Sequence, residues 1–443
     1  MKVLLIQPPI EDFYTTPIRL YPLGLLYAAA TLRRLGCSVE LLDALSPLKR
    51  RQLPIPPIMG YLQPFLEENP LLFKGYYRFG LSDEEIEERV RRSQPDLIGI
   101  STQFTAYFST AERLIRRLLR LNLPIVLGGH HATVFQSEIH RRLPELEAVL
   151  SGPAETALPA FFSRRFGGSE DGVDWKSLTP AHDLAPAADY RIGKKPYISL
   201  TASRGCPFAC EFCSVQAMFG RRFDKRPVED VVLEMTDAVQ SKGVQIINFE
   251  DDNLSVERAW FAELLQRIIA EPALRHVELT AMNGLCYPTL NNELLRLMYL
   301  AGFRRLNLSF VTRDPLLRQR LSRPMQKDDL RGIVEMAKKL GFMVTVYVII
   351  GLPDQTFTEI KQTIDDLLEM GVLVGPSVFY IPPGSSLYNN LEIPQEIMNE
   401  WDLYRSSAFA VETNHLSRRQ LVELFTYVRA ENLRRRQCGT AAA

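Results

Sequence analysis

The 443-residue sequence has no apolar run long enough to cross a membrane, and it contains only six cysteines and six histidines. Its first residues, Met1 to Pro9, include an apolar stretch that is too short for a secretory signal. Lysine plus arginine equal aspartate plus glutamate at 52 each, so no net field attracts nucleic acid or an anionic membrane. These absences predict a cytoplasmic protein without stable membrane insertion or a nucleic-acid partner, and they favour a small-molecule or peptide substrate.

The few cysteines are unevenly spaced. Three of them are isolated and indicate no disulfide framework: Cys37, Cys286 and Cys438. The other three, Cys206, Cys210 and Cys213, lie close enough to place three thiolates on one tight loop. A zinc site or a ferredoxin-type cluster needs a fourth ligand nearby, and the next candidate, His276, lies far downstream. The spacing therefore favours a four-iron cluster with one iron free to bind something else.

Short apolar runs alternate with helical patterns over residues 1–165. Strands are predicted at Lys2 to Ile6, Val39 to Leu42, Leu97 to Ile100, Ile125 to Leu127 and Ala148 to Leu150. Helices are predicted at Tyr21 to Leu35, Glu84 to Arg92 and Thr110 to Leu121. This alternation predicts an α/β, Rossmann-like domain with a parallel sheet, whose ligands bind at the carboxyl ends of the strands.

Residues 166–196 contain Gly, Asp and Pro with little apolar periodicity, which indicates a linker. Over 197–384 the alternation restarts, with strands predicted at Tyr197 to Ala202, Gln245 to Phe249, Val277 to Ala281, Arg305 to Ser309, Met343 to Ile349 and Gly375 to Tyr380. Helices are predicted between them at Pro227 to Gln240, Val256 to Ile269, Asn292 to Ala301, Lys327 to Leu340 and Phe357 to Met370. Six such units predict a partial (β/α)6 TIM-type barrel with a lateral mouth. Residues 385–443 form a helical tail whose aromatic residues are expected to pack in a core.

The cysteine loop, Ser203 to Ser214, resembles the cluster loop of the radical S-adenosylmethionine (SAM) superfamily, in which Cys-x-x-x-Cys-x-x-Cys binds three irons and SAM chelates the fourth. The resemblance assigns Cys206, Cys210 and Cys213 to a 4Fe-4S cluster. It also implies SAM contacts from Phe212 beside the last cysteine, Glu250 and Asp251 after the second barrel strand, Ser309 after the fourth, and Ile349 and Gly351 after the fifth. A carboxylate suits the SAM ammonium, because the two form a strong charge-assisted hydrogen bond. Alternatively, the acidic turn only caps the next helix through Asp252, Asn253 and Ser255.

Turns of the first domain look like the cobalamin-binding domain of one radical SAM branch. The resemblance implies cobalamin contacts from Ser101, Thr102, Gly128, Gly129, His131, Gly152 and Glu155. Two departures stand out: the Asp-x-His-x-x-Gly motif is absent, and the usual Gly-Glu-Gly-Glu turn appears as Gly152-Pro153-Ala154-Glu155. His130 and His131 either ligate cobalt or only satisfy backbone groups and contact a ligand amide.

The resemblance implies that a reduced cluster cleaves SAM to methionine and a 5′-deoxyadenosyl radical, which removes hydrogen from an unactivated position of a small-molecule, lipid or peptide substrate. Methylation from methylcobalamin would follow, with an electron donor such as flavodoxin or ferredoxin. Three alternatives stay open: a radical rearrangement or cyclisation, transfer of the aminocarboxypropyl group of SAM, and a corrinoid-binding regulatory module without turnover. The substrate and the oligomeric state do not follow from the sequence.

Overall fold

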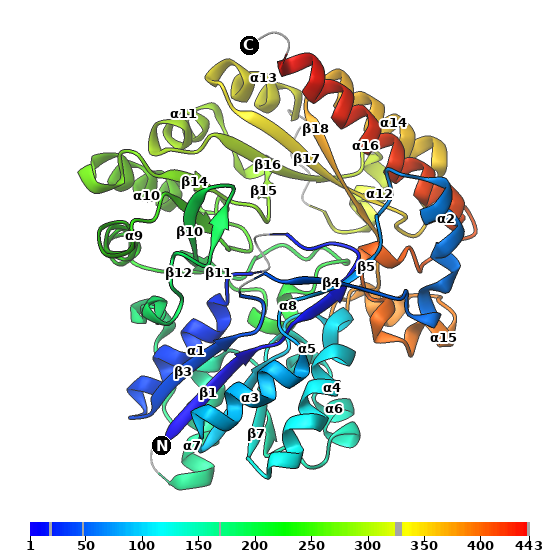
Figure 1. Ribbon diagram of the computed structural model, residues 1–443. Helices are drawn as coiled ribbons and strands as arrows, with labels where there is room; N and C mark the ends of the chain where they lie inside the picture. Colours follow the sequence, from blue (N-terminus) through cyan, green and yellow to red (C-terminus); the bar gives the residue numbers. More distant parts are fainter. Residues whose placement is uncertain (17–19, 47, 168–169, 324–329, 441–443) are drawn as a thin grey trace.

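The structure is a computed structural model that describes residues 1–16, 20–46, 48–167, 170–323 and 330–440 (Figure 1). Its N-terminal half contains a five-stranded parallel sheet of order β3-β1-β6-β7-β8. The strands are β1 Lys2–Gln7, β3 Ser38–Asp43, β6 Leu97–Ser101, β7 Ile125–Gly128 and β8 Ala148–Val149. The order reverses between β1 and β6, and such a switch point is where open α/β sheets bind their ligands. The predicted Rossmann-like sheet is confirmed.

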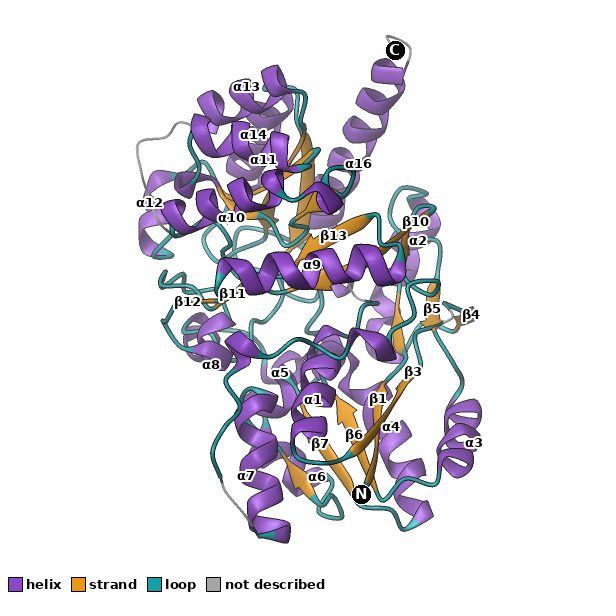
Figure 2. Ribbon diagram, turned by 90° about the vertical axis from the view of Figure 1, so that its left-hand side faces the viewer, coloured by secondary structure: helices purple, strands orange, loops and turns teal. Residues whose placement is uncertain are grey.

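The helices of this half cover both faces of the sheet (Figure 2). They are α1 Leu23–Arg34, α3 Asp83–Ser93, α4 Phe108–Leu118, α5 His130–Val134, α6 Gln136–Arg142 and α7 Ala154–Phe166. Local sequence explains where they begin: Ser82 and Glu85 form a reciprocal capping box at the start of α3. The strands are buried on both sides, as in β1, where Val3 to Ile6 are all buried.

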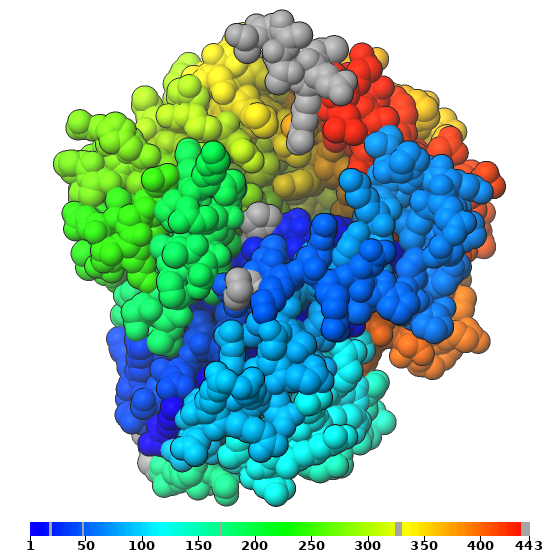
Figure 3. Space-filling model, viewed as in Figure 1, coloured from blue at the N-terminus to red at the C-terminus, as the bar shows by residue number. Residues whose placement is uncertain are grey.

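A small antiparallel sheet of order β2-β5-β4 lies at the edge of this half and was not predicted. It consists of β2 Ile10–Asp12, β4 Arg50–Leu53 and β5 Tyr76–Phe79, and the helix α2 Gln63–Glu68 and the 3-10 turn η2 Pro57–Leu62 lie between β4 and β5. This insertion packs on the C-terminal region, because the Phe73 ring lies 5.9 Å from that of Phe425 and the Tyr61 hydroxyl donates to the Ala408 carbonyl at 2.9 Å. Figure 3 shows the two segments in contact at the surface.

The second half is an open barrel built from two parallel sheets. The strand order runs β9-β10-β13-β14 and then β15-β16-β17-β18, with a parallel bridge from Leu279 to Phe303 between them. Its main strands are β10 Lys195–Leu200, β13 Ile246–Phe249, β14 Glu278–Thr280, β15 Leu285–Cys286, β16 Arg305–Val311, β17 Met343–Ile350 and β18 Leu373–Val378. β9 Arg191–Ile192 adds an antiparallel edge. The predicted partial barrel is therefore confirmed, with β15 as an additional short strand.

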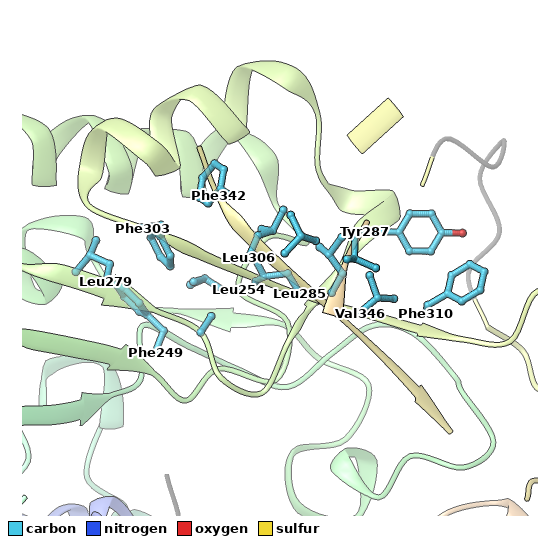
Figure 4. Packing of buried hydrophobic residues seen from close by; sticks show 14 of the residues in the cluster. Phe249, Leu254, Leu279, Leu285, Tyr287, Phe303, Leu306, Phe310, Phe342 and Val346 are labelled. Atoms are coloured by element: carbon cyan, nitrogen blue, oxygen red, sulfur yellow. The ribbon is translucent and has the colours of Figure 1, made fainter. Parts of the chain in front are cut away.

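The helices of the barrel pack on its outer face. They are α9 Val228–Lys242, α10 Arg258–Ala270, α11 Asn292–Ala301, α13 Leu330–Leu340 and α14 Phe357–Glu369, whereas α12 Pro315–Arg320 buries Leu317 in the apolar cluster of the N-terminal sheet. The predicted start of α13 at Lys327 falls outside the described residues. Figure 4 shows the core that they cover, where the Phe249 and Phe303 rings stack with centroids 6.0 Å apart. Alternate side chains of β17 are half-buried and point to the other, inner face.

The segment predicted as a linker contributes to the cores of both halves. Leu178 and Ala181 are buried against the N-terminal sheet, whereas Tyr190 is buried with the barrel residues. The Tyr190 hydroxyl donates to Asp43 at the end of β3 at 2.6 Å. The segment therefore fastens the two halves together, and the predicted domain boundaries at 165, 196 and 384 stay predictions.

The tail ends in two helices, α15 Gln395–Met398 and α16 Arg418–Thr440, and α16 lies along β18 and α14 (Figure 1). Leu421, Leu424 and Val428 on α16 are buried, and among the tail's aromatic residues Tyr404 and Phe409 are buried as well. Asn432 pairs its side-chain amide with both backbone groups of Val374 on the edge strand β18, at 3.1 and 2.7 Å. None of the helices within the described ranges is both long and apolar enough to span a bilayer.

Candidate functional site

The cysteine loop leaves the first main barrel strand at its carboxyl end and is held by tight local geometry. A two-residue strand, β11 Ser203–Arg204, pairs with β12 Asp224–Lys225 and closes the loop at its base. Gly205 has φ +81°, and a Cβ there would lie 2.1 Å from the Arg222 carbonyl oxygen, so only glycine fits. The loop then leads into helix α8 Val215–Phe219. Its backbone is therefore fixed before any cofactor binds.

Each of two cysteine sulfurs has a polar donor beside it. Asn253 Nδ2 donates to Cys206 Sγ at 3.4 Å, and Arg323 Nη1 lies 3.7 Å from Cys210 Sγ. Burial raises the pKa of the Cys206 thiol and raises the pKa of Cys213 to about 11. Metal binding must therefore displace protons, and donors aimed at the sulfurs favour the thiolate form that iron requires. Among the described residues no three such side chains converge on a single metal ion, so this loop is not a preformed mononuclear site, and its three thiols suit a cluster of several irons.

The acidic turn after β13 supports the loop directly. Asp251 is buried and accepts hydrogen bonds from the Ala202 backbone amide at 3.2 Å and from Ser203, through both amide and hydroxyl, at 2.5 Å. Asp252 accepts from the Gly205 amide at 2.7 Å. Both carboxylates thus hold the backbone that carries Cys206, a role that the sequence did not predict.

The alternative reading of this turn as a helix cap is wrong. Helix α10 begins after Glu257, which is its N-cap residue and makes no side-chain cap. Asn253 instead bonds to Cys206, and the Ser255 hydroxyl lies 2.5 Å from that of Thr289. The turn therefore belongs to the cysteine loop rather than to α10.

Glu250 is the remaining carboxylate of the turn. Its Oε1 accepts from Asn248 at 2.5 Å and its Oε2 accepts from Asn283 at 2.9 Å. The pKa of Glu250 is raised to about 7, mainly because the carboxyl is buried. Burial likewise raises the pKa of Asp251 to about 7. With neutral amides as its main partners, Glu250 has no counter-ion among them and is available for a cationic ligand.

The predicted residues at later strand ends also lie near the loop. The Ser309 hydroxyl accepts from Arg323 Nη2 at 2.5 Å, so the same guanidinium contacts Ser309 and Cys210. Arg323 Nε is buried and has no hydrogen-bond partner among the described residues. No spacing or motif marks Arg323 in the sequence, and only the fold brings it beside the loop.

The backbone at the end of β17 lies close to the C-terminal helix α16. Gly351 has φ +93°, and a Cβ there would lie 2.9 Å from Leu421 of α16. Its amide donates to Gln355 at 2.9 Å. Ile349 and Phe212 are half-buried and pack against one cluster of apolar residues. Contact of these residues with SAM stays a prediction.

The N-terminal turns are tied to one another through backbone groups. The Thr102 hydroxyl donates to the Gly128 carbonyl at 3.0 Å, and the Thr133 hydroxyl donates to Gly129 at 2.9 Å and accepts from Gly152 at 3.0 Å. Gly129 has φ +111°, and a Cβ there would meet the Thr102 carbonyl oxygen at 2.8 Å. By contrast, Gly128 and Gly152 face open space. These turns thus form a rigid surface of backbone without side chains, which fits a large planar cofactor.

Ser101 and Thr102 also line a pocket at the sheet's switch point. Gln7 and Pro8 at the end of β1 form one wall, and Phe104 and Tyr107 after β6 form another. Tyr107 is anchored by donation to Asp12 at 2.7 Å, and Asp12 accepts in turn from Ser407 of the tail at 2.6 Å. The tail therefore supports the wall of this pocket.

The two histidines of the turns face different ways. His131 is 0% exposed, and its ring lies 4.3 Å from that of Phe108 and 4.8 Å from that of Trp401. Burial lowers the pKa of His131 to about 3, so it is neutral. Its side chain lies inside the domain while its backbone amide donates to the Thr102 carbonyl at 3.0 Å, and its contact with cobalamin stays a prediction. His130 is half-buried, and its Nε2 lies 3.4 Å from the Ser214 carbonyl next to the last cluster cysteine.

The two predicted sites are in direct contact. Glu155, in the first turn of α7, pairs with Arg204, which stands two residues before Cys206, at 2.8 Å. The Thr133 hydroxyl lies 3.9 Å from the Met218 sulfur on α8. The structure thus brings the glycine turns of one half against the cysteine loop of the other, and it gives Glu155 a protein partner that the sequence did not indicate.

Comparison with known families agrees with both halves of this site. Residues 200–367 match the radical SAM superfamily, and residues 75–162 match the B12 binding domain. The chain therefore contains a radical SAM domain preceded by a B12 binding domain. The radical SAM domain implies a 4Fe-4S cluster and SAM as cofactors, and the B12 binding domain implies cobalamin.

Individual relatives cover most of the chain. It is 24% identical to an uncharacterized methyltransferase of Pyrococcus horikoshii, over 96% of this chain and 90% of the relative. It is 25% identical to cytidylyl-2-hydroxyethylphosphonate methyltransferase of Streptomyces wedmorensis, over 80% of this chain and 73% of the relative. Its fold is similar to that of the radical SAM methyltransferase TsrM from Kitasatospora setae, solved with cobalamin and a [4Fe-4S] cluster, with a TM-score of 0.64 at 16% identity over 94% of this chain and 86% of that one.

Proposed function

We propose that the protein methylates an unactivated position of a small-molecule, lipid or peptide substrate. One observation carries the proposal: the three-cysteine loop and the glycine turns of the B12 binding domain pack against each other. Methyl transfer from one cofactor to a radical made by another requires the two cofactors to face a common space. The methyltransferase names of the relatives support the same activity.

Bound together, the cluster, SAM and cobalamin supply the radical and the methyl group. The protein's own residues bind and orient them. Cys206, Cys210 and Cys213 would hold three irons, while Asp251 and Asp252 keep the loop backbone in place. Glu250 would accept the SAM ammonium, because its pKa near 7 allows the proton to leave when a cation arrives.

The inner face of the barrel offers a place for the substrate. Tyr347 of β17 is half-buried there, and its ring fits against two positions without side chains, since a Cβ on Gly375 would meet it at 2.2 Å and one on Gly284 at 3.2 Å. Burial raises the pKa of Tyr347, so its phenol is protonated and able to donate. Asn283, which bonds to Glu250, lies in the same loop as Gly284. Substrate and SAM would therefore meet between β14 and β17.

The test uses anaerobically reconstituted protein with SAM labelled in its methyl group. We expect iron, sulfide and cobalt in the protein, 5′-deoxyadenosine after reduction, and transfer of label to cobalamin with release of S-adenosylhomocysteine. Formation of 5′-deoxyadenosine without any label transfer would favour rearrangement or cyclisation. Release of 5′-methylthioadenosine would indicate aminocarboxypropyl transfer, and absence of every nucleoside product would indicate a regulatory module.

A further inference from the structure

The pair Arg204–Glu155 is more deeply buried than most ion pairs of this chain that join separate elements. The Arg204 side chain is 12% exposed and the Glu155 side chain 3%. The guanidinium also lies within cation–π distance of three aromatic rings: Tyr27 at 4.5 Å, Trp175 at 4.4 Å and Phe219 at 5.7 Å. Such an arrangement has a large desolvation cost, so stability alone does not account for it.

The surrounding rings come from three different parts of the fold. Tyr27 lies on α1 of the B12 binding half, Trp175 lies in the segment between the halves, and Phe219 ends α8 behind the cysteine loop. One side chain therefore contacts both halves and the connection between them. A planar guanidinium suits this position, because it can stack on rings and pair with a carboxylate at once.

Both ends of the pair stand on rigid backbone next to a cofactor site. Arg204 belongs to β11 and is followed directly by Gly205, whose amide is fixed by Asp252. Glu155 lies in the first turn of α7, just after Gly152, whose amide is fixed by Thr133. The N-terminal end of a helix further favours the charged carboxylate there.

We propose that Arg204 and Glu155 are positioning residues that set the separation between the iron-sulfur cluster and cobalamin. This inference rests on the proposed function for its catalytic consequence. The pair links the loop of one cofactor to the turn of the other through two short, rigid connections. Loss of the pair lets the two cofactor sites shift relative to each other, which impairs the step that needs both cofactors more than the step that needs only the cluster and SAM.

The test compares Glu155→Gln and Arg204→Lys with a matched exposed pair. Arg33 and Asp183 join α1 to the same connecting segment in a two-bond geometry at 2.8 and 2.7 Å, but their side chains are 40% and 61% exposed. Arg33→Lys and Asp183→Asn are therefore the controls. Holoenzyme of each variant is prepared with cob(II)alamin and with its cluster reduced to the paramagnetic [4Fe-4S]+ state, and pulsed electron paramagnetic resonance measures the distance distribution between the two spins.

We expect a broader or shifted distance distribution in Glu155→Gln and Arg204→Lys, and a wild-type distribution in both controls. The ratio of S-adenosylhomocysteine to 5′-deoxyadenosine should fall about tenfold, because small misplacements of reacting groups cost factors of that order. Iron content should stay at the wild-type level. Arg204→Lys decides the matter if Glu155→Gln does not fold.

The proposal is overturned if Glu155→Gln and Arg204→Lys keep the wild-type distance distribution, including the case in which both nucleosides fall by the same factor. A wild-type protein that binds cluster and cobalamin but forms no S-adenosylhomocysteine refutes the proposed function instead, and the distance measurement still decides the role of the pair. A wild-type protein that binds no cobalamin refutes both.

Discussion

The cysteine loop and the glycine turns that face it differ in the means by which we propose that they bind their cofactors. On the loop the proposed ligands are cysteine side chains; Asp251 holds the backbone before them, and Asn253 donates to the Cys206 sulfur. In the turns the ligand-facing surface is largely backbone, held by threonine hydroxyls and by the absence of side chains at Gly128 and Gly152. The cysteine loop can therefore be identified from a short, specific sequence motif. The glycine turns cannot, because they present backbone rather than particular side chains.

The largest effect is expected for a substitution in the cysteine loop. Cys210→Ala removes one of the three predicted cluster ligands, and we expect iron content and 5′-deoxyadenosine formation to fall at least about a hundredfold, more than loss of an outer contact would cause. Cys37→Ala is the control, since Cys37 is buried in the other half. Iron analysis and product chromatography measure both. A Cys210→Ala protein with a full, active cluster would contradict the ligand assignment.

In the glycine turns, one added methyl group should be enough to weaken cofactor binding. Gly129→Ala forces a side chain into φ +111° and against the Thr102 carbonyl, with a strain of about 1–3 kcal/mol. We expect cobalamin binding, followed by its visible spectrum, to weaken at least about tenfold, a loss of the size seen when a residue that supports a metal ligand is changed. Iron content should not change. Gly24→Ala on α1, where nothing lies within 4 Å, should leave both unchanged. Loss of iron in Gly129→Ala would show that the two sites do not assemble independently.

The acidic turn gives a pH test. The pKa of Glu250 is about 7 because of burial, so below pH 7 the carboxyl must lose a proton before it can pair with the SAM ammonium. SAM affinity should therefore rise as pH increases from 6 to 8, by up to about tenfold per unit below the pKa. Equilibrium binding to reconstituted protein measures it. Glu250→Gln should bind more weakly and lack this pH dependence, and the same slope in both proteins would exclude Glu250 as the titrating group.

The smallest effect is expected at His131. His131→Phe loses one hydrogen bond, between His131 Nδ1 and Thr105 at 3.1 Å, and removes a buried Nε2 that no described residue contacts by a hydrogen bond. The phenylalanine ring packs among the aromatic side chains that surround this position. The free energy of unfolding, measured with urea, should therefore change by no more than about 1 kcal/mol. The spectrum of bound cobalamin should not change. A change in its axial-ligand bands would show that this histidine reaches cobalt.

The sequence was a good guide to elements with clear periodicity and to the contiguous cysteine motif. It predicted the strands around both sites to within a few residues, because apolar runs between turn residues mark buried parallel strands. It missed Arg323 and the pairing of Arg204 with Glu155, since those contacts join residues that the fold alone brings together. It also missed the β2-β5-β4 insertion, whose short strands depend on packing against the tail.

The bidentate amide of Asn432 has a consequence for the open barrel as a whole. An unfinished barrel presents the last strand's free polar groups, which would otherwise attract a strand from another molecule. At Val374 a side chain takes the place of that next strand, and the helix that carries it shields the rest. A chain cut short before this asparagine should therefore associate through the exposed edge, which makes the last helix a guard against self-assembly.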